Sequence, residues 1–382
     1  MTTVSDAQEI QHREANGVGI ATLNRPKALN ALNTNMVTLL LDLYRSWDAS
    51  PSVNCIILKG TGGKAFCAGG DVKSVVQKAR EGDIDTGMVF FDREYQLNYL
   101  IHTLRKPHVA LLDGITMGGG AGLSVHGTFR VATEKTLFAM PECAIGLYPD
   151  VGGSFFLPRL PGGLGLYLGL AGARLKGVDV RQAGVATHYV PSALLPELEE
   201  AIVKLGRECT VEQVREILDK FEARAPLPEG ELSVRRRDID AAFGGKGGVE
   251  EVHAALAAYP DQDWAQKRAR HDQQVGCWGG IVGGSPTSQK LTFEQLRRGA
   301  ALPDLRSCLT MEHCMMANVL SDRESDFIEG VRAVLIDRSN DPAWRPASLE
   351  AVSQDKIASY FRLPASVKEL RLAEERQRFA KL

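Results

Sequence analysis

The 382-residue sequence lacks long apolar stretches, a strong net charge and paired cysteine motifs. Its apolar runs, such as residues 109–112, are far shorter than the roughly 20 residues that a membrane-spanning helix requires. The formal net charge of -2 provides no polybasic surface for nucleic acid or anionic lipid. The seven cysteines are scattered without a C-x-x-C pair, which indicates a reduced compartment and no metal site. We therefore expect a small-molecule partner, with no nucleic acid and no membrane.

Targeting signals are sparse as well. Residues 1–10 contain acidic side chains and no Arg-rich amphipathic stretch, so neither a signal peptide nor a transit peptide is visible. The last three residues, Ala380, Lys381 and Leu382, fit the small-basic-leucine form of the peroxisomal address Ser-Lys-Leu. The alternative is a charged helix end that has this form by chance. We expect a peroxisomal location, with the peroxisomal import receptor as a partner of these residues.

What the sequence contains is a strand and helix pattern. Short apolar runs at residues 19–23, 55–59, 109–112 and 129–132 predict buried strands. Residues 35–47 carry an apolar stripe at helical spacing between the first two of these runs. This alternation predicts an α/β domain with a layered sheet.

The second half of the chain differs from the first. Helical periodicity begins at Val211, and runs typical of strands almost vanish beyond it. Prolines and a glycine interrupt the pattern near Pro228, which predicts a boundary between a catalytic domain of residues 1–228 and a mainly helical region of residues 229–382. Ser285 followed by Pro286 predicts a helix start.

Two glycine-rich turns each follow a predicted strand. The first contains Gly69 and Gly70, and the second contains the run Gly118 to Gly120. Neither has the spacing of a Walker phosphate loop or of a dinucleotide loop. A plain tight turn is the alternative for either loop alone. One backbone amide from each loop would form a two-donor oxyanion hole.

A third segment holds two carboxylates among apolar residues. Glu142 and Asp150 lie in the stretch 138–154 with Met, Pro, Leu, Tyr and Val as neighbours. Ionised carboxylates are costly in such surroundings unless they have partners, so the pair indicates function. The alternative is that both are exposed or cap turns.

Serine or thiol catalysis has no support in the sequence. His126 lies near Ser124 and Ser154 in number, but no G-x-S-x-G elbow surrounds either serine. The pair His313 and Cys314 likewise has no partner set for metal or thiol chemistry.

The three segments together resemble the crotonase superfamily of acyl-CoA enzymes, and most of all its 3-hydroxyisobutyryl-CoA hydrolase branch. The resemblance covers most of the chain and includes residues 141–153, 285–288 and 329–337. Where hydratases of the superfamily carry a second catalytic glutamate after the triple glycine, this chain has Gly122. Hydration needs two carboxylates that share a water. Because Gly122 provides no carboxylate, the sequence favours a reaction other than hydration.

The resemblance also implies a fold and a set of site residues. The fold is a spiral of strand-strand-helix repeats with a helical C-terminal region. The amides of Gly70 and Gly119 would form the oxyanion hole, and Glu142 would be the central catalytic carboxylate. Asp150 would orient the substrate hydroxyl or assist proton transfer. Two further substrate contacts are implied, namely Ala68 beside the adenine of CoA and Glu94 against the substrate.

Several alternatives stay open at this point. Glu142 could attack the thioester or activate a water, and Glu94 could be a solvated helix charge. Hydration or isomerisation of an enoyl-CoA and a non-catalytic acyl-CoA-binding role are the competing functions. The implied reaction is hydrolysis of 3-hydroxyisobutyryl-CoA in valine catabolism, with no cofactor because CoA is part of the substrate. Relatives in the superfamily are often trimers or hexamers, so a homo-oligomer is a further expectation.

Overall fold

The computed structural model describes residues 8–260, 281 and 283–373. In this part of the chain, six strands form one sheet in the order β1-β2-β3-β5-β7-β10, and four form a second in the order β4-β6-β8-β9. The strands are β1 Ile10–Ala15, β2 Val18–Leu23, β3 Cys55–Gly60, β4 Ala65–Cys67, β5 His108–Leu112, β6 Ile115–Met117, β7 Phe129–Ala132, β8 Leu137–Ala139, β9 Leu175–Lys176 and β10 His188–Tyr189.

The larger sheet is parallel except at one edge. The hairpin β1-β2 is antiparallel, whereas β2-β3, β3-β5, β5-β7 and β7-β10 are parallel pairs. β5 is buried along its whole length, as parallel strands are when helices cover both faces of a sheet. The predicted strands at residues 19–23, 55–59, 109–112 and 129–132 are confirmed as β2, β3, β5 and β7.

The chain winds between the two sheets as a spiral. β3 in the larger sheet is followed by β4 in the smaller, β5 is followed by β6, and β7 is followed by β8. Each turn of the spiral therefore adds one strand to each sheet before the next helical segment. This arrangement confirms the fold that the sequence resemblance implied.

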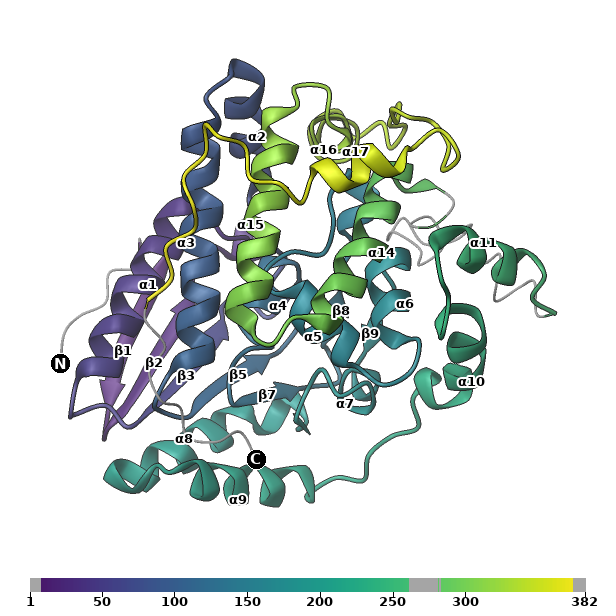
Figure 1. The fold of residues 1–382 in the computed structure, drawn as a ribbon. Coiled ribbons are helices and arrows are strands. Elements are labelled where there is room, and N and C mark those ends of the chain that lie inside the picture. The colour runs from purple at the N-terminus through teal and green to yellow at the C-terminus, as the bar shows by residue number, and fades with distance from the viewer. Residues whose placement is uncertain (1–7, 261–280, 282, 374–382) are drawn as a thin grey trace.

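Helices enclose the two sheets (Figure 1). α8 and α9 cover one face of the larger sheet through a buried apolar cluster, and α1 and α3 pack together on its other side. The helices are α1 Thr34–Ala49, α2 Val72–Glu81, α3 Ile84–Thr103, α4 Gly119–Gly122, α5 Gly153–Phe156, α6 Leu164–Ala171, α7 Val178–Gln182, α8 Leu195–Leu205, α9 Val211–Glu222, α10 Glu231–Phe243, α11 Val249–Ala257, α14 Pro286–Ala301, α15 Leu305–Ser321, α16 Asp326–Gly330 and α17 Gln354–Ser359.

The last third of the described chain packs onto the part that carries the glycine loops. α15 lies beside α3, and α14 contacts α5 and α6 (Figure 1). The predicted start of α14 is confirmed, because the side chain of Ser285 accepts a hydrogen bond from the amide of Ser288 and Pro286 occupies the first turn. Among the helices of the described residues, none is both long and apolar enough to cross a bilayer.

Candidate active site

The first glycine loop follows β4 and pairs with the segment before α1. The amide of Leu32 donates to the carbonyl of Gly69 (2.8 Å), and the amide of Asp71 donates to the carbonyl of Leu32 (2.7 Å). This parallel bridge turns the amide of Gly70 away from Leu32. Within the described residues, that amide has no hydrogen-bond acceptor. Gly70 thus has a donor available for a ligand.

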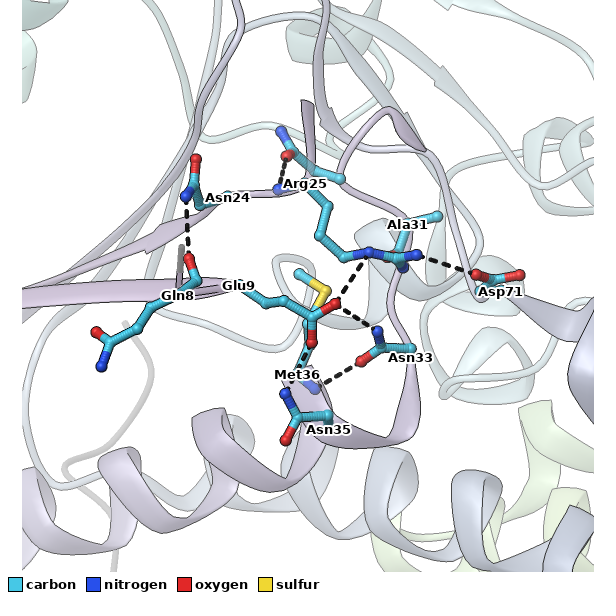
Figure 2. Close-up of polar contacts among 10 residues, drawn as sticks. Gln8, Glu9, Asn24, Arg25, Ala31, Asn33, Asn35, Met36 and Asp71 are labelled. Carbon is cyan, nitrogen blue, oxygen red and sulfur yellow. Dashed lines mark hydrogen bonds and ion pairs between the residues drawn. The ribbon is translucent and has the colours of Figure 1, made fainter. Parts of the chain in front are cut away.

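Ion pairs fix the segment that holds this loop (Figure 2). The guanidinium of Arg25 pairs with Glu9 (3.2 Å) and with Asp71 (3.3 Å), and it donates to the carbonyl of Ala31 (2.7 Å). The same Glu9 carboxylate accepts from Asn33, whose side chain caps α1. The network therefore joins the residues on both sides of the Leu32–Gly70 bridge.

The second glycine loop approaches the first closely. Gly118 has φ 46° and ψ −117°, a conformation that side chains other than hydrogen strongly disfavour. A Cβ atom on Gly119 would lie 3.4 Å from the amide nitrogen of Gly70, and one on Gly120 would lie 2.2 Å from the carbonyl oxygen of Cys67. Gly119 begins α4, and its amide also lacks an acceptor in the described part of the chain. The two free amides are neighbours, as the oxyanion-hole prediction requires.

Two glutamates border these loops. A Cβ atom on Gly119 would lie 2.5 Å from Oε1 of Glu94, and one on Gly118 would lie 3.0 Å from Oε1 of Glu142. Glu94 comes from α3 and is 2% exposed, so it is not a solvated helix charge. Glu142 begins the 3-10 helix Glu142–Ile145 and is 6% exposed. Both carboxyl groups therefore lie beside the free amides.

Burial governs the charge of these groups. It raises the pKa of Glu142 well above its usual value, and repulsion from Asp150 raises it further. Burial likewise raises the pKa of Glu94, with added repulsion from Asp150 and Glu142. Within the described residues, Oε2 of Glu142 and Oε1 of Glu94 have no hydrogen-bond partner. Buried polar atoms without partners are uncommon, and here they gather at one place.

Asp150 stands on a strained turn. It is 5% exposed, and its Oδ2 accepts a hydrogen bond of 3.0 Å from the hydroxyl of Tyr95 on α3. Burial raises the pKa of Asp150 to about 7, while the Tyr95 hydrogen bond lowers it. The next residue, Val151, has φ 50°, which is a genuine outlier for a β-branched residue. Such strain persists only where the surroundings hold the backbone in place.

Side chains from three distant segments hold this turn. Nε2 of His126 donates to the carbonyl of Val151 (2.7 Å), and the amide of Gln295 on α14 donates to the carbonyl of Pro149 (2.6 Å). Glu312 on α15 accepts hydrogen bonds from the amides of Gly152 and Ser154, both at 2.8 Å. Side chains from three segments thus hold the backbone on both sides of Asp150.

Glu312 is a residue that the sequence analysis missed. It is fully buried, and its Oε1 also accepts from the hydroxyl of Ser154 (2.5 Å). Burial raises the pKa of Glu312 to about 8, while the hydrogen bonds from Ser154 and Gly152 lower it. No motif marks this glutamate, because it lies 162 positions after Asp150 in number and meets the turn only in the folded chain. An apolar helix face interrupted by one acidic residue was the only available signal.

Gly122 has no room for a side chain. A Cβ atom at this position would lie 2.7 Å from Cβ of Val151 and 2.8 Å from Nδ2 of Asn98. The place where a second glutamate would begin is therefore filled by Val151 and Asn98. The carboxyl groups around the free amides come instead from Glu94, Glu142 and Asp150.

A separate cavity of about 940 Å³ lies elsewhere in the fold. It is lined by residues that precede β5, β7 and β10, including Arg105, Thr128 and Thr187. The glycine loops instead follow β4 and β6, which come after the other ends of β3 and β5 in the chain, so this cavity is remote from them. Its lining contains neither Glu142 nor Asp150, and we do not assign the reaction to it. In the described part of the chain, no cluster of His, Cys, Asp and Glu has the arrangement of a metal site.

Known proteins resemble this chain over most of its length. The family model described as enoyl-CoA hydratase/isomerase matches residues 18–361. The protein named 3-hydroxyisobutyryl-CoA hydrolase, mitochondrial, from Xenopus laevis is 46% identical over 91% of this chain and 87% of its own length. The protein of the same name from Homo sapiens is 42% identical over 93% of this chain and 89% of its own length.

A solved structure shares the whole architecture. The crystal structure of a carnitinyl-CoA dehydratase from Mycobacterium thermoresistibile has a TM-score of 0.85 and 35% sequence identity, and the match covers 96% of this chain and 100% of that one. The activity in its name differs from that of the two hydrolases. Overall likeness thus establishes the fold, and the reaction has to be argued from the site.

The comparisons overturn one expectation. The hydrolases from Xenopus laevis and Homo sapiens are named mitochondrial, so the expected peroxisomal location was wrong. The import receptor was expected on the same ground and is not shown. Ala380, Lys381 and Leu382, on which that expectation rested, lie outside the described residues. Three residues are too short a pattern to separate an address from a charged chain end that matches it by chance.

Proposed function

The chain belongs to the enoyl-CoA hydratase/isomerase family, and we propose that it hydrolyses 3-hydroxyisobutyryl-CoA to 3-hydroxyisobutyrate and CoA. One observation carries the proposal. Within the described residues, the backbone amides of Gly70 and Gly119 have no acceptors. They lie beside two buried carboxyl groups, on Glu94 and Glu142, that each have one oxygen without a hydrogen-bond partner, and position 122 has no room for a further glutamate. The names of the two hydrolases supply the acyl group and, with it, a place in valine catabolism.

The reaction begins at the thioester carbonyl. Its oxygen accepts hydrogen bonds from the amides of Gly70 and Gly119, which stabilise the negative charge that grows there in the transition state. Donors that are fixed before the reaction need no reorganisation, and removal of one such donor typically costs about 10²–10³-fold in kcat. The close approach of the two glycine loops is what fixes these donors.

Glu142 supplies the carboxylate that acts on the carbonyl carbon. In one route its oxygen attacks this carbon, the carbon–sulfur bond breaks, and water then cleaves the resulting mixed anhydride. In the other route Glu142 removes a proton from a water, and that water attacks directly. In both routes the sulfur of CoA leaves with the bonding electron pair and takes up one proton.

Asp150 is suited to that proton transfer. Its pKa of about 7 means that both its protonated and its ionised forms are populated near neutral pH. We assign to it the delivery of a proton to the leaving sulfur or the orientation of the substrate. The partly exposed Ala68 would lie beside the adenine of CoA, and the buried Glu94 would contact the acyl portion.

Hydration of an enoyl-CoA is the competing function, and the name of the Mycobacterium thermoresistibile enzyme favours it. Addition of water across a double bond requires one group to deliver a proton and another to remove one. The close contacts at Gly122 exclude a glutamate at the position where hydratases carry their second one, so Glu94 or Asp150 would have to replace it. We therefore rank hydration below hydrolysis.

The test is thiol release from 3-hydroxyisobutyryl-CoA by the purified protein and by Glu142→Gln. We expect the variant to lose thioester cleavage by at least about 10³-fold because the ionisable group is gone while the side-chain shape is kept. Binding of CoA, measured by calorimetry, should be retained. Near-normal turnover of the variant would remove Glu142 from the mechanism.

A further inference from the structure

Asn98 is a fully buried residue whose side-chain amide makes no hydrogen bond within the described residues. It lies on α3 with 0% exposure, and neither Nδ2 nor Oδ1 has a hydrogen-bond partner. A buried polar group without a partner costs about 1–3 kcal/mol. Asn30, which is equally buried, provides a contrast. Its Nδ2 donates to the carbonyls of Thr61 and Ala65, and its Oδ1 accepts from the amide of Arg25.

The position of Asn98 relative to the oxyanion hole is defined by two neighbouring helices. On α3, Asn98 lies one helical turn after Glu94, whose Oε1 borders Gly119. On α4, Gly122 lies about one turn after Gly119, and a Cβ atom there would be 2.8 Å from Nδ2 of Asn98. Glu94 thus lies beside the first residue of α4, and Asn98 lies beside its last residue, one helical turn further along. One turn corresponds to about 5.4 Å along the helix axis.

That spacing fits the acyl group of the proposed substrate. In a 3-hydroxyacyl thioester, the hydroxyl oxygen is separated from the carbonyl carbon by two further carbons, which spans only a few ångströms. With the carbonyl oxygen at the amides of Gly70 and Gly119, a group one level further along α4 is placed to meet the 3-hydroxyl. The amide of Asn98 is the unpartnered group at that level.

We propose that the side chain of Asn98 binds the 3-hydroxyl group of a 3-hydroxyacyl thioester and so selects hydroxylated acyl chains. The proposal rests on the proposed function. A carboxamide can donate from Nδ2 and accept at Oδ1, and a hydroxyl group can do both in return. An amide also adds no charge beside Glu94, Glu142 and Asp150, whereas a fourth carboxylate would repel all three.

The test compares two substrates that share one carbon skeleton, 3-hydroxyisobutyryl-CoA and isobutyryl-CoA, which lacks the hydroxyl group. The variant is Asn98→Leu, which keeps a similar volume and removes both polar atoms. We expect its kcat/KM for the hydroxylated substrate to fall about tenfold or more, in line with one lost hydrogen bond in a buried site. Its kcat/KM for isobutyryl-CoA should be unchanged or higher.

Thermal unfolding is the second readout. Removal of two unpartnered polar atoms should leave the melting temperature of Asn98→Leu equal to or above that of the wild type. If this variant does not fold, the same substrate ratio is measured with Asn98→Ala. A matched control is Asn54→Leu, because Nδ2 of Asn54 is also buried without a partner but lies before β3, at the far end of that strand from Gly70.

The outcomes are distinguishable. A selective loss on the hydroxylated substrate, absent from Asn54→Leu, supports the hydroxyl subsite. An equal loss on both substrates, or no loss, overturns it and leaves Asn98 a structural residue. If the wild type itself releases no thiol from 3-hydroxyisobutyryl-CoA, the proposed function fails instead.

Discussion

Oδ2 of Asp150 accepts a hydrogen bond of 3.0 Å from the hydroxyl of Tyr95, and both side chains are buried. This bond favours the ionised form of Asp150, whereas burial favours the neutral form and raises the pKa to about 7. The charge of Asp150 therefore depends on a balance that one hydroxyl group can shift.

Tyr95→Phe should move the pH profile of the reaction toward higher pH. Loss of the hydrogen bond removes an effect that lowers the pKa of Asp150, so the group stays protonated to a higher pH. In the wild type we expect a pH-dependent limb of kcat/KM near pH 7, and in the variant a shift of about one pH unit, equivalent to about 1.4 kcal/mol. Tyr99→Phe is the control, because the Tyr99 hydroxyl contacts Arg306 instead. Coincident profiles for the three proteins would contradict the assignment.

The buried carboxyl groups should make the fold less stable as pH rises. A carboxyl group whose pKa is higher in the folded than in the unfolded state contributes stability that is lost as pH rises through the folded value. Burial raises the pKa values of Asp150 and Glu312 to about 7 and about 8, so the loss begins near the unfolded values of about 4 and is complete by about pH 8.5, and unfolding is compared at pH 5 and pH 8.5. Denaturant unfolding at these two pH values measures it. Equal or greater stability at pH 8.5 would count against the raised values.

Glu94→Gln should stabilise the fold at pH 8.5 and weaken catalysis. Burial and repulsion from Asp150 and Glu142 disfavour a charge on Glu94, and the neutral amide removes that cost. We expect a gain of about 1 kcal/mol or more at pH 8.5 and a smaller gain at pH 6.5. Glu216→Gln, at an exposed position on α9, is the control. A destabilised Glu94→Gln variant would show that the carboxylate is needed by the fold.

Gly122→Glu should not create a hydratase. The new Cβ atom would lie 2.7 Å from Cβ of Val151, which already has a strained backbone. Overpacking of this kind typically costs about 1–3 kcal/mol, so the melting temperature should fall without any gain in hydration of crotonyl-CoA. At Gly283, a Cβ atom would meet nothing within 4 Å, so Gly283→Glu is the matched control. Rapid hydration by Gly122→Glu would disprove this steric argument.

Glu312→Gln should lower turnover although Glu312 does not touch the substrate in our account. Both of its oxygens accept hydrogen bonds from the turn after Asp150, and a Gln side chain would place an NH₂ group against one backbone amide. We expect a loss of about 1–3 kcal/mol in unfolding free energy and a lower kcat. The control Glu294→Gln removes two ion pairs on α14, with Arg297 and Arg298, and each such exposed pair is worth less than about 1 kcal/mol. An unchanged kcat for Glu312→Gln would show that the turn does not need this support.

Local sequence patterns predicted four strands of the larger sheet and the start of one helix. Apolar runs predicted β2, β3, β5 and β7 because each of these strands is buried and short, and Ser285 with Pro286 predicted the start of α14. The glycine loops were predicted because close approach of two backbones leaves a visible excess of glycine. The boundary near Pro228 stays a prediction.

The remainder of the site depends on contacts between distant segments. Glu312, His126 and Gln295 support one turn from three different segments, and no spacing within the sequence connects them. The positive φ of Val151 is invisible in the sequence, since valine is the type of residue least expected there. Asn98 has no motif, and only the pairing of α3 with α4 shows that its amide faces Gly122.

The central claim is that this member of the family cleaves a thioester and does not hydrate an enoyl-CoA. Its most direct test follows thiol release from 3-hydroxyisobutyryl-CoA and loss of enoyl absorbance from crotonyl-CoA in parallel samples of the wild type. With no room at Gly122 for the glutamate that hydratases carry there, we expect thiol release to exceed hydration by at least about 10²-fold. Rapid hydration with negligible thiol release would contradict the account.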